Sequence, residues 1–151
     1  GGPDGGEPIG DVLITGAKLQ GAEVGGKEIP KLIDELPLVA MAGALARGKT
    51  VIRDARELRV KESDRIATMA ANLQAVGVKV IEREDGMEIQ GPAPLDKEAV
   101  IQSYGDHRVA MSMAVLALYG KEPICIMNID CIATSYPAFW DDLKRLGAHV
   151  E

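Results

Sequence analysis

The densest group of charged side chains lies at residues 56–65, which read Arg-Glu-Leu-Arg-Val-Lys-Glu-Ser-Asp-Arg. Lys61 and Arg65 are cations, and an arginine binds phosphate or carboxylate groups through two parallel hydrogen bonds. Glu62 stands between them, where a carboxylate tuned by burial can take up and deliver protons. The alternative interpretation is a solvated, charged helix start, capped by its Ser or Asp and without any chemistry.

A second charged group, residues 104–108, directly precedes a long apolar stretch. Asp106 is placed to cap a helix there, and His107 and Arg108 would lie in its first turn. Cations are unfavourable at the positive end of a helix unless an anion or a carboxylate is nearby. Anion binding and local structural pairing both fit this pattern. His107 is either a partner that orients Asp106 or a carrier of protons.

Two further polar positions also stand at expected helix starts. Asp34 precedes the apolar stretch that begins at Pro37, where it fits a helix cap or an acid–base role. Thr134 and Ser135 precede Pro137, where they fit a cap or a phosphate contact. If the helices are parallel copies, all these starts gather on one side of the domain. Such an electropositive surface with embedded carboxylates suits a small polyanion that exchanges protons.

The elements that must position these residues follow from the hydrophobic periodicity. Residues 37–46 and 107–119 are apolar on almost every face, which predicts two buried helices. Apolar positions at helical spacing predict amphipathic helices at 63–76 and 136–146. Short strands are expected at 12–15, 50–53, 78–82, 87–90, 123–129 and from 148 onward.

The two halves of the chain are similar at an offset of 70 residues. Val-Ala-Met at 39–41 recurs at 109–111, and the stretch 73–80 resembles 143–150. We therefore expect repeated βαβα-type units within one domain. Residues 1–30 would be a lead-in and the end of a preceding unit, and 31–96 and 97–151 would be the repeat units. The expected fold class is α/β (α+β), with buried parallel helices inside and short-stranded sheets around them.

Composition narrows the classes of function. The 151 residues carry 17 Lys and Arg against 23 Asp and Glu, and only five aromatic side chains. An acidic chain with few aromatics argues against nucleic acid as the main partner. No apolar stretch reaches the roughly 20 residues that span a bilayer, and we expect no membrane partner. Cys125 and Cys131 stand in or beside an apolar run, which favours buried, reduced thiols in a cytoplasmic protein.

Four segments resemble signatures of the 5-enolpyruvylshikimate-3-phosphate (EPSP) synthase family, the 3-phosphoshikimate 1-carboxyvinyltransferases. They read Leu-Arg-Val-Lys-Glu-Ser-Asp-Arg-Ile at 58–66, Gly-Asp-His-Arg-Val-Ala-Met at 105–111, Ile-Ala-Thr-Ser-Tyr-Pro-Ala-Phe at 132–139 and Ile-Asp-Glu-Leu-Pro at 33–37. The likeness covers nearly the whole chain from about residue 12. A related transferase that acts on a UDP-sugar shares the fold, but it is not expected to carry the Lys-Glu-Ser-Asp-Arg string.

The resemblance implies two globular domains, each built from three similar units, with the active site in the cleft between them. It implies transfer of the enolpyruvyl group of phosphoenolpyruvate to the 5-hydroxyl of shikimate 3-phosphate, with release of phosphate. The reaction is an addition–elimination through a tetrahedral intermediate, and it needs no metal or organic cofactor. It belongs to the shikimate pathway of aromatic amino-acid biosynthesis, in the cytoplasm, and is the target of glyphosate.

The resemblance also implies roles for three residues near the acceptor and the reacting carbon. Asp34 matches the carboxylate that takes the proton of the 5-hydroxyl and holds the shikimate ring. Lys61 matches a lysine that contacts shikimate 3-phosphate near the reacting centre. Glu62 matches the carboxyl group that transfers a proton at the methylene carbon of phosphoenolpyruvate.

Further matches concern phosphoenolpyruvate itself. Arg65 and Arg108 match the arginines that hold it, and Asp106 and His107 match their supporting neighbours. Some members carry a lysine where this chain has Thr134. The resemblance implies that this cationic contact to phosphoenolpyruvate is absent or supplied elsewhere, in a pocket that glyphosate also occupies.

The chain is about one third of the length expected for the family, so the N-terminal domain of the same enzyme is an expected partner. We expect the chain alone to be inactive, and either associated or marginally stable because part of its core lacks a cover. Two alternatives stay open. One is a non-catalytic anion-binding domain that kept the fold, and the other is an enolpyruvyl transferase for a different acceptor.

Overall fold

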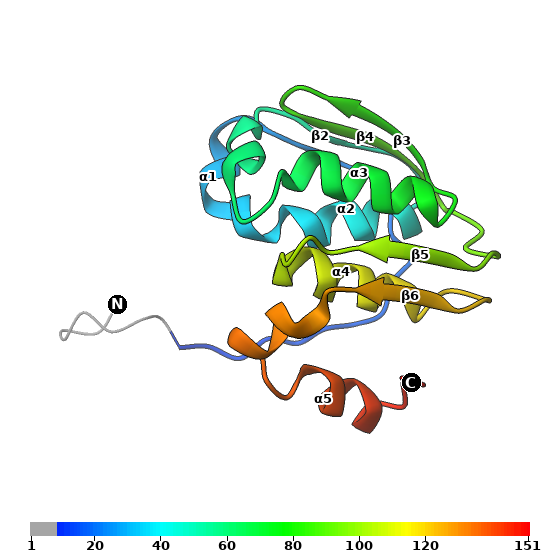
Figure 1. The fold of residues 1–151 in the computed structure, drawn as a ribbon. Coiled ribbons are helices and arrows are strands. Elements are labelled where there is room, and N and C mark those ends of the chain that lie inside the picture. Colours follow the sequence, from blue (N-terminus) through cyan, green and yellow to red (C-terminus); the bar gives the residue numbers. More distant parts are fainter. Residues whose placement is uncertain (1–8) are drawn as a thin grey trace.

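The computed structural model describes residues 9–151 (Figure 1). The helices are α1 (Ile29–Leu32), α2 (Leu36–Leu45), α3 (Arg65–Ala75), α4 (His107–Ala117) and α5 (Phe139–Arg145). The strands are β1 (Glu23–Val24), β2 (Gly48–Ile52), β3 (Lys79–Arg83), β4 (Gly86–Gly91), β5 (Ala99–Gln102) and β6 (Ile124–Met127). Short 3-10 turns at Gly26–Glu28, Ile33–Glu35, Arg56–Val60 and Ile129–Thr134 precede or follow the helices.

Two small sheets repeat one arrangement. A four-stranded sheet has the order β1-β2-β4-β3, in which β1 and β2 are parallel and the other pairs are antiparallel. The second sheet consists of β5 and β6, which are also parallel. Along the chain, one long helix lies between the two strands of each parallel pair. This helix is α2 in the first sheet and α4 in the second. This repetition of a β-α-β arrangement agrees with the expected internal repeat, while the unit boundaries at residues 30 and 96 stay predictions.

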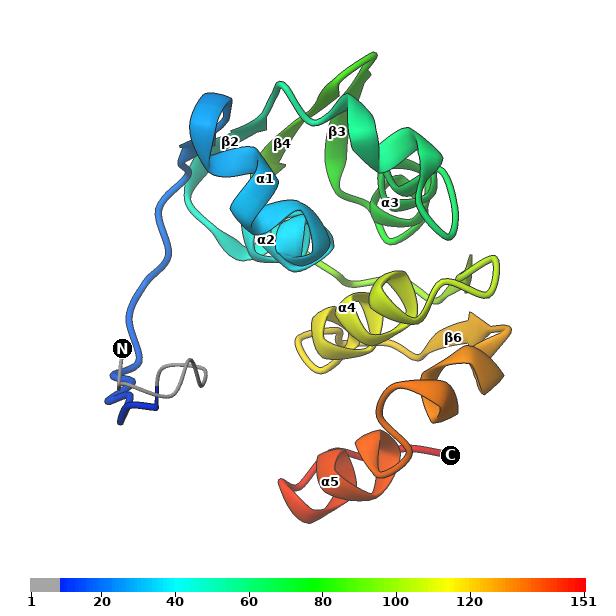
Figure 2. The same cartoon turned by 90° about the vertical axis from the view of Figure 1, so that its left-hand side faces the viewer.

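The three long helices pack against one another between the two sheets. Figure 2 shows α2, α3 and α4 nearly end-on, with the four-stranded sheet against α2 and α3 and β6 beside α4. Leu36, Ile66, Leu73 and Met113 form the centre of their contact and are almost completely buried. The expectation of parallel helices inside and short strands outside is confirmed. All three helices begin at the same edge of the molecule (Figure 1).

The α2 helix is less enclosed than its composition predicts. Leu38 is 47% exposed, and Val39 and Leu45 are only partly buried. A helix that is apolar on every face was expected to be buried on every face, and within residues 9–151 that expectation is wrong for one side of α2. The stripe around Leu38, which also includes Val39 and Leu45, is therefore partly open to solvent in this chain.

Several local predictions also fail. Val12, Leu13 and Ile14 are almost fully exposed and form no strand, and residues 148–150 form no strand either. A β-rich sequence becomes a strand only when a neighbouring strand completes its hydrogen bonds. The sequence patterns also missed β5, which pairs with β6.

The cysteines differ from expectation in burial. Both are free thiols, as expected, but Cys125 is exposed and Cys131 is only half-buried. In β6 the alternate residues Ile124 and Ile126 turn inward, so Cys125 is left on the outer face. Within residues 9–151, no helix has the length and apolar character needed to cross a membrane.

Candidate functional site

Arg65 is the centre of an ion cluster at the edge where the helices begin. It is the first residue of α3, and its side chain is 0% exposed. The guanidinium donates from Nε to Asp106 Oδ2 at 2.8 Å and from Nη2 to Asp106 Oδ1 at 3.3 Å. It also donates from Nη1 to Asp34 Oδ1 at 3.2 Å and from Nη2 to Glu62 Oε2 at 2.7 Å. One buried cation thus binds three carboxylates.

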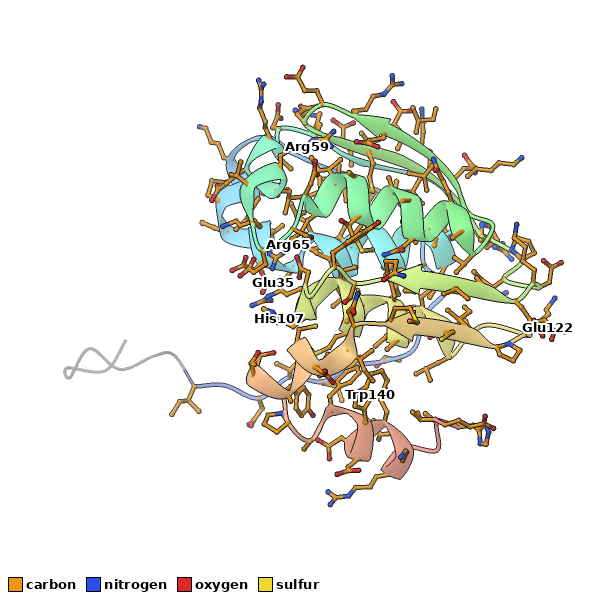
Figure 3. The ribbon with its side chains drawn as sticks, viewed as in Figure 1. Glu35, Arg59, Arg65, His107, Glu122 and Trp140 are labelled. Atoms are coloured by element: carbon orange, nitrogen blue, oxygen red, sulfur yellow. The ribbon has the colours of Figure 1, made fainter. Side chains whose placement is uncertain are left out.

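The three carboxylates come from segments that are far apart in the sequence. Asp34 lies in the 3-10 turn before α2, Glu62 lies in the loop before α3, and Asp106 is the N-cap of α4. They meet because the parallel helices all start at this edge, where Figure 3 labels Arg65. Asp34 is 47% exposed and Glu62 is 53% exposed, so both also face solvent.

Asp106 is the only one of the three carboxylates without exposure, since its side chain is 0% exposed. Besides Arg65, it accepts a hydrogen bond from Ser63 Oγ at 2.9 Å and from the backbone N–H of Arg108 at 3.0 Å. Burial alone would raise the pKa of Asp106, but the hydrogen bonds from Arg65 and Ser63 and the charge of Arg65 outweigh it. The pKa of Asp106 therefore lies below its ordinary value, and this carboxylate stays ionised.

Arg65 shows the complementary effect. Burial alone would lower its pKa, because a desolvated cation is unfavourable. The hydrogen bond and charge of Asp106, followed by the charge of Glu62, outweigh burial and raise the pKa of Arg65. The guanidinium is therefore a permanent positive charge inside the molecule.

The other two predicted cations are partly exposed at the same edge. Arg108 donates from Nη1 to the backbone oxygen of Asp34 at 3.2 Å and to Glu35 Oε1 at 3.1 Å. Lys61 Nζ lies 3.0 Å from Glu57 Oε1. Both side chains retain exposure, 36% for Arg108 and 25% for Lys61. A ligand anion can therefore approach either of them directly, which it cannot do at Arg65.

His107 lies in the first turn of α4 and is half-buried (Figure 3). Within residues 9–151, Asp106 takes its side-chain hydrogen bonds from Ser63 and Arg65, and none from His107. The structure therefore gives no support to the interpretation in which His107 orients Asp106. Thr134 donates to Cys131 O at 2.7 Å within its own turn.

Two residues have contacts that the sequence patterns did not assign. Ser63 was expected as one of two alternative helix caps, but Asp64 caps α3 by accepting from the N–H of Ala67 at 3.0 Å. Ser63 instead supports Asp106 across the helix interface. Glu35 pairs with Arg108, although it was read only as part of a helix start. The sequence offered one signal for a role of Glu35, which is that it directly follows Asp34.

A shallow cavity of about 470 Å³ opens beside this cluster. Glu62 lies at its edge, with Tyr104 and Thr68 among its other walls. Tyr104 is largely exposed and has a positive φ of 52°, in the turn that leads into Asp106. The cavity gives a ligand direct access to Glu62.

Comparison with known proteins places the chain in a family. The family model described as EPSP synthase (3-phosphoshikimate 1-carboxyvinyltransferase) matches residues 7–143. The chain is 48% identical to the 3-phosphoshikimate 1-carboxyvinyltransferase of Geobacter metallireducens over 143 residues, which is 95% of this chain and 33% of the relative. It is 54% identical to that of Desulforamulus reducens over 142 residues, covering 94% of this chain and 33% of the relative. The chain thus spans about a third of the length of these curated relatives.

Solved structures give the same result. EPSP synthase from Acinetobacter baumannii superimposes with a TM-score of 0.84 at 38% identity, over 89% of this chain and 32% of that one. The enolpyruvyl transferase NikO from Streptomyces tendae reaches a TM-score of 0.65 at 25% identity, over 78% of this chain and 26% of that one. Because the family model spans most of the 151 residues, the chain belongs to the EPSP synthase family, the 3-phosphoshikimate 1-carboxyvinyltransferases.

Proposed function

We propose that this chain supplies one wall of an active site that transfers the enolpyruvyl group of phosphoenolpyruvate to the 5-hydroxyl of shikimate 3-phosphate. One observation carries the proposal. The buried guanidinium of Arg65 binds Asp34 and Glu62 at the same time, at 3.2 and 2.7 Å. Asp34 and Glu62, the two candidate proton carriers, therefore bind the two terminal nitrogens of one guanidinium, and both side chains also face solvent.

The proposed reaction needs two proton transfers that these carboxylates can perform. Asp34 takes the proton of the 5-hydroxyl as its oxygen bonds to the central carbon of phosphoenolpyruvate, and Glu62 gives a proton to the methylene carbon. The product of this addition is a tetrahedral intermediate. Phosphate then leaves with the electrons of its C–O bond and takes up the proton held by Asp34, while a proton returns from the methyl group to Glu62, which restores the enol double bond.

The cations of the site would bind the negative charges of both substrates. Arg65 and Arg108 hold phosphoenolpyruvate, and Lys61 contacts shikimate 3-phosphate near the reacting centre. Asp106 and His107 are neighbours that support these residues. Cations placed before the reaction stabilise charge as it develops on the departing phosphate, because they need no rearrangement at that moment.

The proposal also includes what the chain needs from outside. It spans about a third of its curated relatives, so further substrate contacts are expected from the part that it does not match. We expect the 151-residue chain alone to be inactive. We place the reaction in the cytoplasm, which fits the two free thiols.

The test uses an exchange enzyme, defined as the Geobacter metallireducens relative with its matched third replaced by this chain. Phosphate release from phosphoenolpyruvate and shikimate 3-phosphate is expected from the exchange enzyme and not from the chain alone. Asp34→Asn and Glu62→Gln should each lower kcat by at least about a hundredfold, as expected for loss of a general acid or base. Glu84→Gln is the matched control, since Glu84 is an exposed partner of Arg56 at 2.7 Å, away from the cluster.

A folded exchange enzyme that binds both substrates but releases no phosphate would overturn the proposal in favour of a non-catalytic anion-binding domain. A second candidate function, transfer to another acceptor, is favoured by the likeness to the enolpyruvyl transferase NikO. Binding of phosphoenolpyruvate without binding of shikimate 3-phosphate, and without phosphate release in its presence, would support that candidate. The higher identity to EPSP synthases makes shikimate 3-phosphate the acceptor we propose.

A further inference from the structure

The three carboxylates around Arg65 are of two kinds. Asp106 accepts two of the hydrogen bonds of the guanidinium, at 2.8 and 3.3 Å, and is completely buried. Asp34 and Glu62 accept one each, and about half of each side chain faces solvent. The cluster therefore has one interior partner and two partners at the surface.

Asp106 is fixed by more than Arg65. Ser63 Oγ donates to it from the start of α3, and the N–H groups of Arg108 and Val109 donate to it as the cap of α4. Displacing Asp106 would leave these donors and a buried charge without partners, which is strongly unfavourable. Asp34 and Glu62 carry no such constraint, because water can solvate either carboxylate once it leaves Arg65.

The burial of Arg65 restricts how a ligand can reach it. Its side chain has no exposed surface, so a carboxylate from solvent contacts the guanidinium only where Asp34 or Glu62 now does. Binding in addition to both would place a fourth anion beside one cation, which like-charge repulsion opposes. Replacement of one carboxylate by another keeps the charge-assisted hydrogen bond and avoids that repulsion.

We propose that Asp106 is the permanent counter-ion and positioning residue of Arg65, whereas Asp34 and Glu62 are exchangeable partners, of which the carboxylate of phosphoenolpyruvate displaces Glu62. This inference rests on the proposed function. It gives the cluster a second use, because binding the substrate frees Glu62 from its ion pair. The freed carboxyl group then lies at the edge of the open cavity, where it can transfer a proton.

The proposal predicts opposite effects of two neutral substitutions on one dissociation constant. Phosphoenolpyruvate is titrated into the exchange enzyme in the absence of shikimate 3-phosphate. Asp106→Asn should weaken binding about tenfold or more, because the guanidinium of Arg65 is no longer held in position by the two hydrogen bonds that Asp106 accepts. Glu62→Gln should tighten binding about threefold or more, because the ligand then displaces a neutral amide in place of a carboxylate.

Two matched controls separate these effects from general changes. Asp64→Asn changes the other capping aspartate, which pairs with Arg59. Glu57→Gln removes a carboxylate that pairs with Lys61 but does not touch Arg65. Both should leave the dissociation constant within about twofold of the unaltered protein, which is the scale of small surface effects.

The results decide the proposal in each case. A dissociation constant for Asp106→Asn within twofold of that for Asp64→Asn would overturn the role of Asp106, and unchanged or weaker binding by Glu62→Gln would overturn the exchange. If Asp106→Asn does not fold, Ser63→Ala replaces it, with an expected weakening of about threefold for loss of one hydrogen bond to Asp106. An unaltered exchange enzyme that is active, with variants that do not differ, overturns this inference alone. If the unaltered exchange enzyme binds neither substrate, the proposed function is overturned as well.

Discussion

Arg59 and Arg65 lie six residues apart, and each binds more than one carboxylate, but their other contacts and their burial differ. Arg59 donates to Asp64 and Glu82, and also to the backbone oxygens of Arg83 and Glu84 at the end of the β3–β4 hairpin. Within residues 9–151, the side chain of Arg65 donates only to carboxylates, which come from three separate segments. Figure 3 labels both arginines, with Arg59 above Arg65 in that view.

The pKa of both arginines is raised, for different balances of causes. At Arg59 the hydrogen bond that it donates to Glu82 is the largest cause, and the Arg59 side chain is 24% exposed. At Arg65 burial is the largest single influence and lowers the pKa, but the hydrogen bonds and charges of the carboxylates together raise the pKa by more. A raised pKa alone therefore does not mark a functional arginine. The proposed exchange rests on a different property of Arg65, which is that two of its three carboxylate partners, Asp34 and Glu62, face solvent.

The largest expected difference between the two arginines is in stability. Arg65→Met leaves Asp106 as a buried charge without a cation, which should lower the free energy of unfolding by about 3 kcal/mol or more. Asp34 and Glu62 add little to this loss, because they are half exposed and regain water. Arg59→Met should cost about 1 kcal/mol or less, since its ion pairs are partly solvated.

Urea denaturation of the purified chain and its variants measures this difference. The double variant Arg65→Met, Asp106→Asn is the control, and it should recover part of the loss because the uncompensated charge is gone. Equal losses for Arg59→Met and Arg65→Met would show that the burial of Arg65 has no energetic consequence and would break the comparison.

The next prediction concerns pH and tests Asp106 alone. Its pKa in the folded protein lies below the ordinary value of about 3.9. A lowered pKa stabilises the fold above the unfolded value, and this contribution is lost as pH falls through the folded value. Asp106→Asn removes it. The two proteins should differ most near pH 7, by roughly 1–3 kcal/mol, and the difference should shrink below about pH 4.

Urea denaturation at a series of pH values from 7 to 3 follows this difference directly. A constant difference between the unaltered chain and Asp106→Asn across the series would contradict the prediction. It would mean that Asn disturbs packing or the cap of α4, and that the charge of Asp106 has no part in stability.

The sequence predicted the place of the site better than its contacts. Spacing and charge put Asp34, the 56–65 group and Asp106 at helix starts, and parallel helices do bring them together. The pairing of Arg65 with Asp106 spans 41 residues, and local patterns carry no information on such a contact. The same limit explains why Ser63 was read as a cap although it supports Asp106.

The fold shows a parallel limit. Periodicity found the long helices, because periodicity is a property of neighbouring residues. The offset of 70 predicted repeated βαβα-type units, and the structure has two β-α-β arrangements, although the sequence patterns missed β5. The residues Val12, Leu13 and Ile14 have strand propensity but no partner strand within residues 9–151. The stripe around Leu38 is apolar but uncovered. Whether an apolar segment is paired or covered depends on the rest of the protein, which a local pattern does not contain.

The smallest expected effect concerns the cap of α3, Asp64, which is also a partner of Arg59. Asp64 accepts from the N–H of Ala67 and pairs with Arg59, much as Asp106 caps α4 and pairs with Arg65. Asp64→Ala should cost about 1 kcal/mol of unfolding free energy, the usual effect of losing a cap. Phosphoenolpyruvate binding by the exchange enzyme should stay within about twofold, because Arg65 keeps every partner. A tenfold loss of binding in Asp64→Ala would mean that the start of α3 positions Arg65 as a whole, and that Asp106 has no special place among its partners.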